Sequence, residues 1–95
     1  MKIGITGQNG FIGWHLSQTL KYIFPLEFKL IPFNRNFFYN KDLLDKFTSN
    51  CDCIVHLAGV NRDTNEKNIN KINTELAVKL IQSFERIKFK GKLIF

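Results

Sequence analysis

The first residues with a chemical signature are three glycines near the start of the chain. Gly7, Gly10 and Gly13 stand in TGQNGFIG, between an apolar run and an amphipathic stretch. In a strand–turn–helix unit such glycines permit a tight turn, backbone approach to a pyrophosphate, and close packing of the helix on the sheet, in that order. Amides at the helix start, around Phe11 and Ile12, then donate to phosphate oxygens. The stretch predicts a nucleotide-binding turn, and the alternative is a tightly packed turn that binds nothing.

A second signature lies at the end of the next apolar run. NAD-binding folds usually place Asp or Glu there to bind the ribose 2′-hydroxyl, whereas a 2′-phosphate needs a cation. The segment KLIPFNRN, residues 29–36, contains no acidic residue. Arg35 and the neighbouring Asn34 are therefore predicted to bind the 2′-phosphate of NADP(H), with NAD(H) as the less favoured cofactor. A surface arginine in a turn is the alternative.

The elements that must position these residues alternate along the chain. Apolar runs predict strands, and apolar residues spaced by three or four predict helices. The predicted strands span 2–6, 27–33, 53–57 and 92–95, and the predicted helices span 12–23, 42–47 and 69–87. Residues 37–39 are expected to form a very short extended piece, and residues 61–68 a polar loop.

This alternation predicts an α/β fold, a Rossmann-type parallel sheet with flanking helices joined by right-handed crossovers. A native domain rarely stops at a bare apolar strand such as residues 92–95. We therefore expect residues 1–95 to be the N-terminal part of an NAD(P)-binding Rossmann domain, catalytically inactive and poorly soluble alone.

Composition limits the other classes of function. Fourteen Lys and Arg against eight Asp and Glu give a net charge of +6, but the lysines are scattered, so we expect no nucleic-acid partner. Cys51 and Cys53 form a lone C-x-C without metal-ligand spacing, so no metal site is predicted. No apolar run is long enough to span a bilayer and no signal-peptide pattern is present, so a cytoplasmic protein is expected.

The glycine turn and two later segments together resemble one family. TGQNGFIG, Asp52 followed by IVHLAG (54–59), and Asn73-Thr74-Glu75 at the head of a long helix are similar to the extended short-chain dehydrogenase/reductases, the NAD-dependent epimerase/dehydratase family. The resemblance covers the whole chain. It implies a nucleotide-sugar substrate and leaves a homodimer open. The cofactor-binding residues it implies, together with those argued above, are Gly7, Asn9, Gly10, Phe11, Ile12, Gly13, Asn34, Arg35, Leu57, Ala58 and Gly59.

A narrower resemblance rests on VHLAGVNR, residues 55–62. It is similar to the capsular polysaccharide reductase branch of the family, which reduces a UDP-linked 4-keto-6-deoxy sugar with NADPH and adds a C-terminal cupin domain. The family's usual third strand is shortened or missing here, so DLLD (42–45) matches the adenine-contacting segment only loosely.

The family's chemistry needs a tyrosine acid/base and a lysine four residues later, and the chain has no such pair. Tyr22 and Tyr39 are each followed at that distance by leucine, so no catalytic residue is predicted. A non-catalytic NADP-binding regulator of the same fold and, less favoured, a small basic nucleic-acid-binding domain remain the alternatives. His56 is interpreted as a core histidine because it lies in an apolar strand. Arg62 is expected to contact phosphate, substrate or solvent.

Overall fold

The N-terminal strand β1 (Lys2–Thr6) lies inside a parallel sheet with the strand order β2-β1-β3-β4. Its neighbours are β2 (Lys29–Ile31) on one side and β3 (Cys53–His56) on the other, and β4 (Lys92–Ile94) forms the edge beyond β3. This computed structural model describes residues 1–59 and 65–95. The chain crosses from one side of β1 to the other between β2 and β3, which makes the carboxyl ends of β1 and β3 a topological switch point.

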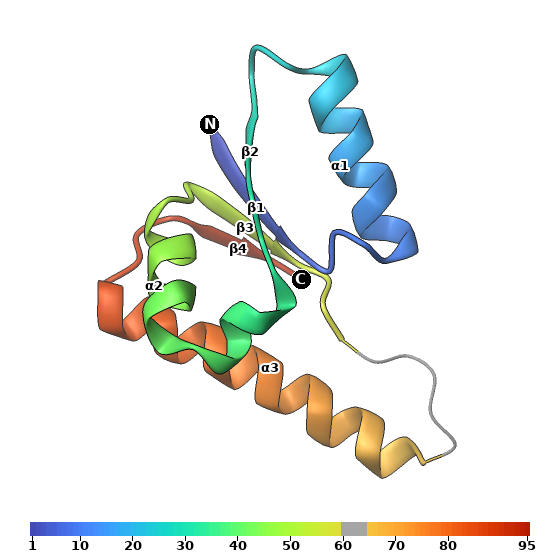
Figure 1. The fold of residues 1–95 in the computed structure, drawn as a ribbon, viewed down its shortest axis with the longest axis vertical. Helices are drawn as coiled ribbons and strands as arrows, with labels where there is room; N and C mark the ends of the chain where they lie inside the picture. Colours follow the sequence, from blue (N-terminus) through green and yellow to red (C-terminus); the bar gives the residue numbers. More distant parts are fainter. Residues whose placement is uncertain (60–64) are drawn as a thin grey trace.

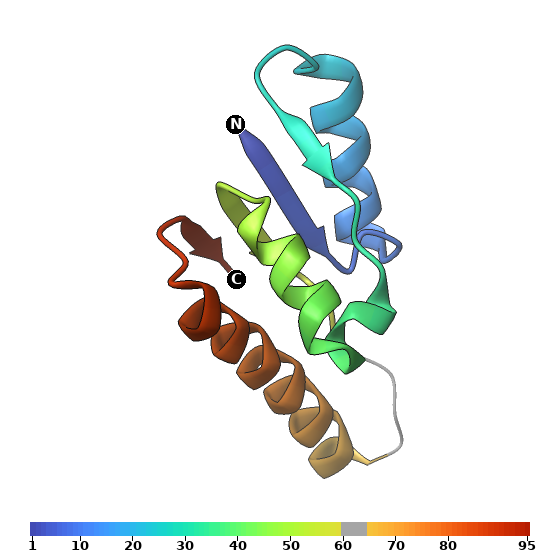
Figure 2. The same ribbon diagram turned by 60° about the vertical axis from the view of Figure 1, so that its left-hand side comes forward.

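Helices cover both faces of the sheet (Figure 1). Helix α1 (Phe11–Ile23) packs on one face against β1 and β2. Helices α2 (Lys41–Ser49) and α3 (Glu66–Ile87) lie side by side on the other face, as the rotated view in Figure 2 also shows. This arrangement follows from right-handed crossovers, because the chain reverses its direction across the sheet after β2.

The face under α2 and α3 carries the larger core. Its buried residues are Phe33, Phe38, Leu44, Phe47, Cys51, Ile54, Leu76 and Leu80. Gly4 makes this packing possible, because a Cβ at that position would overlap the ring of Phe47 and the sulfur of Cys51. The two cysteines lie in different core clusters as free thiols, and burial raises the pKa of Cys51 to about 12, so this thiol stays protonated and unreactive.

A polar network joins α2 to α3 along their outer contact. The Asp45 carboxylate accepts hydrogen bonds from Ser83 Oγ at 2.6 Å and from Arg86 Nη2 at 2.8 Å. Ser83 Oγ also lies 2.8 Å from the buried hydroxyl of Thr48. The hydrogen bonds from the Arg86 guanidinium hold the pKa of Asp45 below its ordinary value, so the carboxylate is ionised at neutral pH.

The structure confirms the predicted fold class and corrects several local predictions. Strand β1 is confirmed, but β2 and β3 are shorter than predicted. Residues 37–39 are not extended: they belong to the 3₁₀ helix η1 (Arg35–Tyr39), which Asn34 caps by accepting from Asn36 N–H at 2.9 Å. Helix α2 is longer than predicted at both ends. Helix α3 begins before residue 69, because Asn65 caps it by accepting from Lys67 N–H at 3.0 Å.

Candidate functional site

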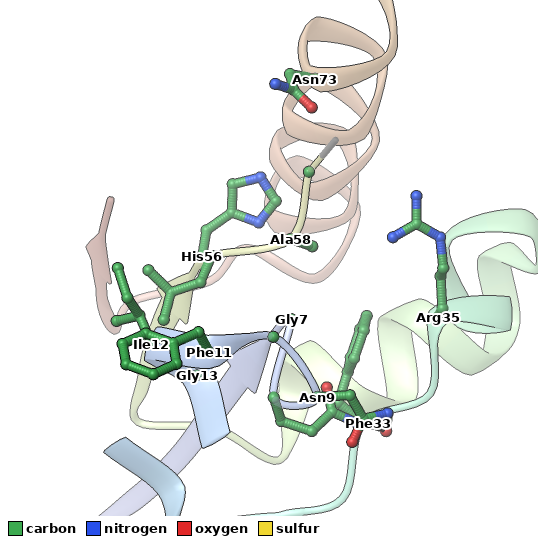
Figure 3. Close-up of a pocket in the computed structure, with 14 residues that line it drawn as sticks. Gly7, Asn9, Phe11, Ile12, Gly13, Phe33, Arg35, His56, Ala58 and Asn73 are labelled. Atoms are coloured by element: carbon green, nitrogen blue, oxygen red, sulfur yellow. Dashed lines mark hydrogen bonds between the residues drawn. The ribbon is translucent and has the colours of Figure 1, made fainter. Parts of the chain in front are cut away.

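A pocket of about 700 Å³ opens at the carboxyl ends of β1 and β3, at the switch point of the sheet (Figure 3). Most of the predicted site residues line it. The lining residues are Gly7, Gln8, Asn9, Gly10, Phe11, Ile12, Gly13, Phe33, Arg35, His56, Leu57, Ala58, Gly59 and Asn73.

The turn between β1 and α1 is shaped by its first glycine. Gly7 has a φ of 81°, in the left-handed region that favours glycine, and a Cβ there would lie 2.7 Å from the backbone nitrogen of Ala58. Its carbonyl accepts a hydrogen bond from Gly10 N–H at 3.0 Å, which closes the turn. The turn therefore lies directly against the end of β3.

The second and third glycines have different surroundings. A Cβ at Gly10 would meet only the Gly7 carbonyl oxygen, at 3.3 Å, so this residue leaves space on the pocket side. A Cβ at Gly13 would overlap that same carbonyl group. The third glycine thus lets α1 pack closely on the turn itself, whereas the sequence argument expected it to relieve a clash with the sheet.

The start of α1 has the features of an anion-binding helix terminus. Gly10 is its N-cap residue, no side chain caps the helix, and its first turn contains no acidic residue. The first amides of a helix have no intrahelical acceptor, and the helix dipole adds partial positive charge there. The residues Phe11 and Ile12 that carry these amides both line the pocket.

A cation lies on the opposite side of the pocket. Arg35, the first residue of η1, lines the pocket across from Phe11 and Ile12 (Figure 3). The side-chain amide of Gln8 donates to the carbonyl oxygen of Phe33, which ties the glycine turn to the segment that carries Arg35. Asn34 does not line the pocket, because its side chain is used to cap η1.

Thr6, the last residue of β1, fixes the backbone of two pocket-lining residues at the end of β3. Its buried Oγ1 accepts hydrogen bonds from Leu57 N–H at 3.1 Å and Ala58 N–H at 3.2 Å. The same oxygen lies 2.7 Å from His56 Nδ1. Because Oγ1 already accepts two hydrogen bonds, we assign its single proton to the contact with Nδ1, which leaves the proton of a neutral imidazole on Nε2.

His56 is therefore a buried histidine, as the sequence predicted, but one that also lines the pocket. Burial lowers its pKa, which keeps the imidazole uncharged near neutral pH. Its ring makes edge-on contacts with Phe38 and Phe95, with centroids 6.2 and 6.1 Å away. These contacts and the hydrogen bond from Thr6 fix the orientation of the ring.

The sequence reasoning missed Gln8, Phe33, His56 and Asn73 as lining residues. His56 and Asn73 both lie in the quoted motifs, and the position of His56 one residue before Leu57 was the available signal. Asn73 faces the β3 end from α3, close enough that a Cβ on Gly59 would lie 2.7 Å from its Oδ1. Gln8 also lies in a quoted motif, between the predicted site residues Gly7 and Asn9. Phe33 had no such signal, because its place depends on how the chain returns after β2.

Several predictions concern groups away from this pocket. Within residues 1–59 and 65–95, no cluster of three or more potential metal ligands is present. No helix in that part of the chain is long and apolar enough to cross a membrane. Arg62 and the end of the VHLAGVNR segment lie outside the described residues.

Proteins of known structure share this fold. The chain aligns over 98% of its length with RMD from Pseudomonas aeruginosa complexed with NADPH, at 24% sequence identity and a TM-score of 0.79. It aligns over 97% with the UDP-N-acetylglucosamine 4-epimerase from Bacillus cereus, at 18% identity and a TM-score of 0.73. A variant of uronate dehydrogenase from Agrobacterium tumefaciens complexed with NAD aligns over 90%, at 17% identity and a TM-score of 0.62.

The chain spans 34% of the length of RMD and 36% of the other two structures. No protein-family model matches the chain, and no curated protein sequence matches it. At these identities the structural similarity shows the α/β Rossmann fold, in agreement with the predicted fold class.

Proposed function

We propose that this chain is the NADP(H)-binding part of a nucleotide-sugar reductase or epimerase of the extended short-chain dehydrogenase/reductase family. The observation that carries the proposal is the uncapped start of α1, which faces a pocket at the switch point of the sheet. Gly7 lets the turn lie against the end of β3, Gly13 lets α1 pack on that turn, and Gly10 leaves room for a pyrophosphate. Residues 1–95 then form the N-terminal part of the cofactor domain.

The structural relatives support a nicotinamide dinucleotide as the ligand. RMD is described with NADPH, and the uronate dehydrogenase variant with NAD. Arg35 favours NADP(H) here, because its planar guanidinium suits a 2′-phosphate and no carboxylate lies at the corresponding strand end, residues 29–36. NAD(H) is the alternative cofactor.

The proposed substrate is a UDP-linked 4-keto-6-deoxy sugar used in surface polysaccharide synthesis. This narrower proposal rests on the VHLAGVNR segment and its likeness to the capsular polysaccharide reductase branch. The bound nucleotide would supply hydride transfer, while the described residues of this chain bind and orient it. On this proposal the acid/base tyrosine and its lysine would be supplied from outside these 95 residues, because no such pair occurs within them.

Titration of the intact protein with NADPH and NADH tests the phosphate assignments. Gly10→Val should abolish binding of both cofactors while the far-UV circular dichroism is largely retained, because the branched side chain occupies the pyrophosphate space. Undiminished affinity in this variant would remove the basis for the phosphate site.

Arg35→Ala should weaken NADPH by about 1.5–3 kcal/mol, the range for hydrogen bonds to charged groups, and leave NADH nearly unchanged. Lys29→Ala is the matched control, because it removes one exposed cation from the start of β2 without touching the pocket. Equal losses for both cofactors in Arg35→Ala would show that the arginine does not bind the 2′-phosphate.

Turnover separates an enzyme from a non-catalytic regulator of the same fold. The intact protein should oxidise NADPH when a UDP-linked 4-keto-6-deoxy sugar is added, measured as loss of absorbance of the reduced nicotinamide. If the protein binds NADPH tightly but does not oxidise it when any nucleotide sugar is added, the non-catalytic regulator is favoured.

A further inference from the structure

The strand order places three different chemical groups in sequence along the carboxyl edge of the sheet. Arg35 follows β2, the amides at the start of α1 follow β1, and His56 ends β3. Strand β1 lies between the other two. The order across the pocket is therefore a cation, then an anion-binding helix start, then a neutral ring.

A phosphorylated dinucleotide presents its groups in a matching order. Its 2′-phosphate lies on the adenosine, its pyrophosphate lies in the middle, and its second nucleoside lies beyond the pyrophosphate. If Arg35 binds the 2′-phosphate and α1 binds the pyrophosphate, the second nucleoside extends toward the end of β3. Of the residues there that line the pocket, 56–59, His56 is the one with a polar side chain.

The imidazole of His56 has one N–H free to donate a hydrogen bond at the end of β3. Nδ1 is occupied by the Thr6 hydroxyl at 2.7 Å, so the remaining proton is on Nε2. No side-chain nitrogen or oxygen in the described residues is both fully buried and without a hydrogen-bond partner. Nε2 forms no hydrogen bond within the described residues, so this nitrogen is open to the pocket that the histidine lines. Phe38 and Phe95 hold the ring plane edge-on, which limits the direction in which Nε2–H can point.

We propose that His56 is a binding residue of this site, whose Nε2–H donates a hydrogen bond to an oxygen of the second nucleoside of the bound dinucleotide. The proposal rests on the proposed function and adds the orientation of the ligand. A neutral donor suits this half of the ligand, because ribose hydroxyl and amide oxygens are uncharged acceptors. Thr6 acts through His56 as a positioning residue, since its hydroxyl selects the tautomer.

Two probes test this assignment in the intact protein. Both contain the adenosine half of the dinucleotide, and only one contains the second nucleoside. NADPH carries both nucleosides, whereas adenosine 2′,5′-bisphosphate carries the adenosine and its 2′-phosphate and lacks the second nucleoside. His56→Phe keeps an aromatic ring and removes the donor. It should weaken NADPH about three- to ten-fold, as expected for one neutral hydrogen bond, and change the affinity for the bisphosphate by less than about two-fold.

Two further variants act as controls. His56→Gln restores an N–H donor near the position of Nε2 and should recover part of the lost NADPH affinity. Arg35→Ala should weaken both probes, because both carry the 2′-phosphate. Equal losses for the two probes in His56→Phe, or no loss for NADPH, would overturn the inference while the proposed function stands. If wild-type protein binds neither probe, the proposed function itself fails, and the inference fails with it.

The tautomer of His56 can be measured directly, without a bound ligand and without binding measurements on variants. Two-bond proton–nitrogen correlation spectra of histidine-labelled protein should show His56 protonated at Nε2 and unprotonated at Nδ1 near neutral pH. Thr6→Val removes the hydroxyl with little change in shape and should shift the population toward the Nδ1–H tautomer. A wild-type His56 that carries its proton on Nδ1 would overturn the inference even if His56→Phe does not fold.

Discussion

The two faces of the sheet differ in how completely they are covered. Under α2 and α3, eight buried apolar residues form one cluster, and the helices are joined by the network around Asp45. Under α1, only four buried residues form the cluster: Ile3, Ile5, Leu20 and Cys53. Large apolar side chains on and after α1 remain exposed, with Leu26 96% and Phe11 81% exposed.

This contrast separates stability from ligand binding. Burial of apolar surface is the main favourable term in folding, so the α2 and α3 face supplies most of the stability of the described chain. The α1 face instead supplies the turn and the helix start that line the pocket. Substitutions on the two faces should therefore change different measurements.

The largest effect is expected at Leu80, which is 1% exposed in α3. Leu80→Ala should lower the free energy of unfolding by about 3 kcal/mol, within the range for buried leucines, while NADPH affinity of the folded fraction changes little. Ile81→Ala, at the next residue of the same helix and 43% exposed, is the control and should cost far less. Urea unfolding curves measure both. Similar losses in the two variants would mean that this face is not the dominant core.

A smaller effect on stability, with a larger effect on binding, is expected at Gly13. Gly13→Ala forces a Cβ against the Gly7 carbonyl, so α1 must shift away from the turn at a cost of about 1–3 kcal/mol. The shift also displaces the amides at the helix start, and NADPH binding should be strongly weakened. Gly10→Ala is the control for folding, because its Cβ meets that carbonyl at 3.3 Å. Equal stability of the two alanine variants would contradict the close packing described for Gly13.

The smallest expected effect is a pH dependence of the free energy of unfolding. It arises at His56, which lies in the sheet between the two faces. Burial lowers its pKa below the ordinary value of 6.5, so under mildly acidic conditions the unfolded chain binds a proton that the folded chain does not. The free energy of unfolding should therefore fall as the pH drops below about 6.5, and level off once the folded histidine is also protonated.

Urea unfolding at pH 8 and pH 5.5 measures this slope. His56→Gln should lose the part of the slope that arises from this residue. His15→Gln, at the exposed histidine of α1, should keep it, because His56 is still present. An identical slope in wild type and His56→Gln would show that His56 titrates alike in the folded and unfolded chains.

The fold class and most of the pocket were predictable because their signals are local. Apolar runs identified β1, and the glycine spacing identified the turn after it, in which Gly7 has a positive φ. The position of Arg35 in the pocket also agreed with its place after the second strand.

The parts that were not predicted depend on contacts between distant residues. Residues 37–39 read as extended because they are aromatic, but Phe38 becomes buried among α2 and α3 side chains, and the Asn34 cap favours a 3₁₀ turn. Gln8 is tied to Phe33 across the pocket, and His56 to Thr6 across two strands. Neither pairing leaves a trace in local sequence patterns.

The central position of β1 has a consequence for the order of events during synthesis. Strand β1 is synthesised before both of its partners, β2 and β3, and the Thr6–His56 contact joins residues 50 positions apart. Sheet contacts of such long sequence separation form slowly, because much chain entropy is lost before they are made. The β3-facing edge of the apolar segment IGI (residues 3–5) therefore stays unpaired until Cys53–His56 have been translated. During this interval the nascent chain depends on early coverage by α1, or on a chaperone, to avoid pairing with another polypeptide.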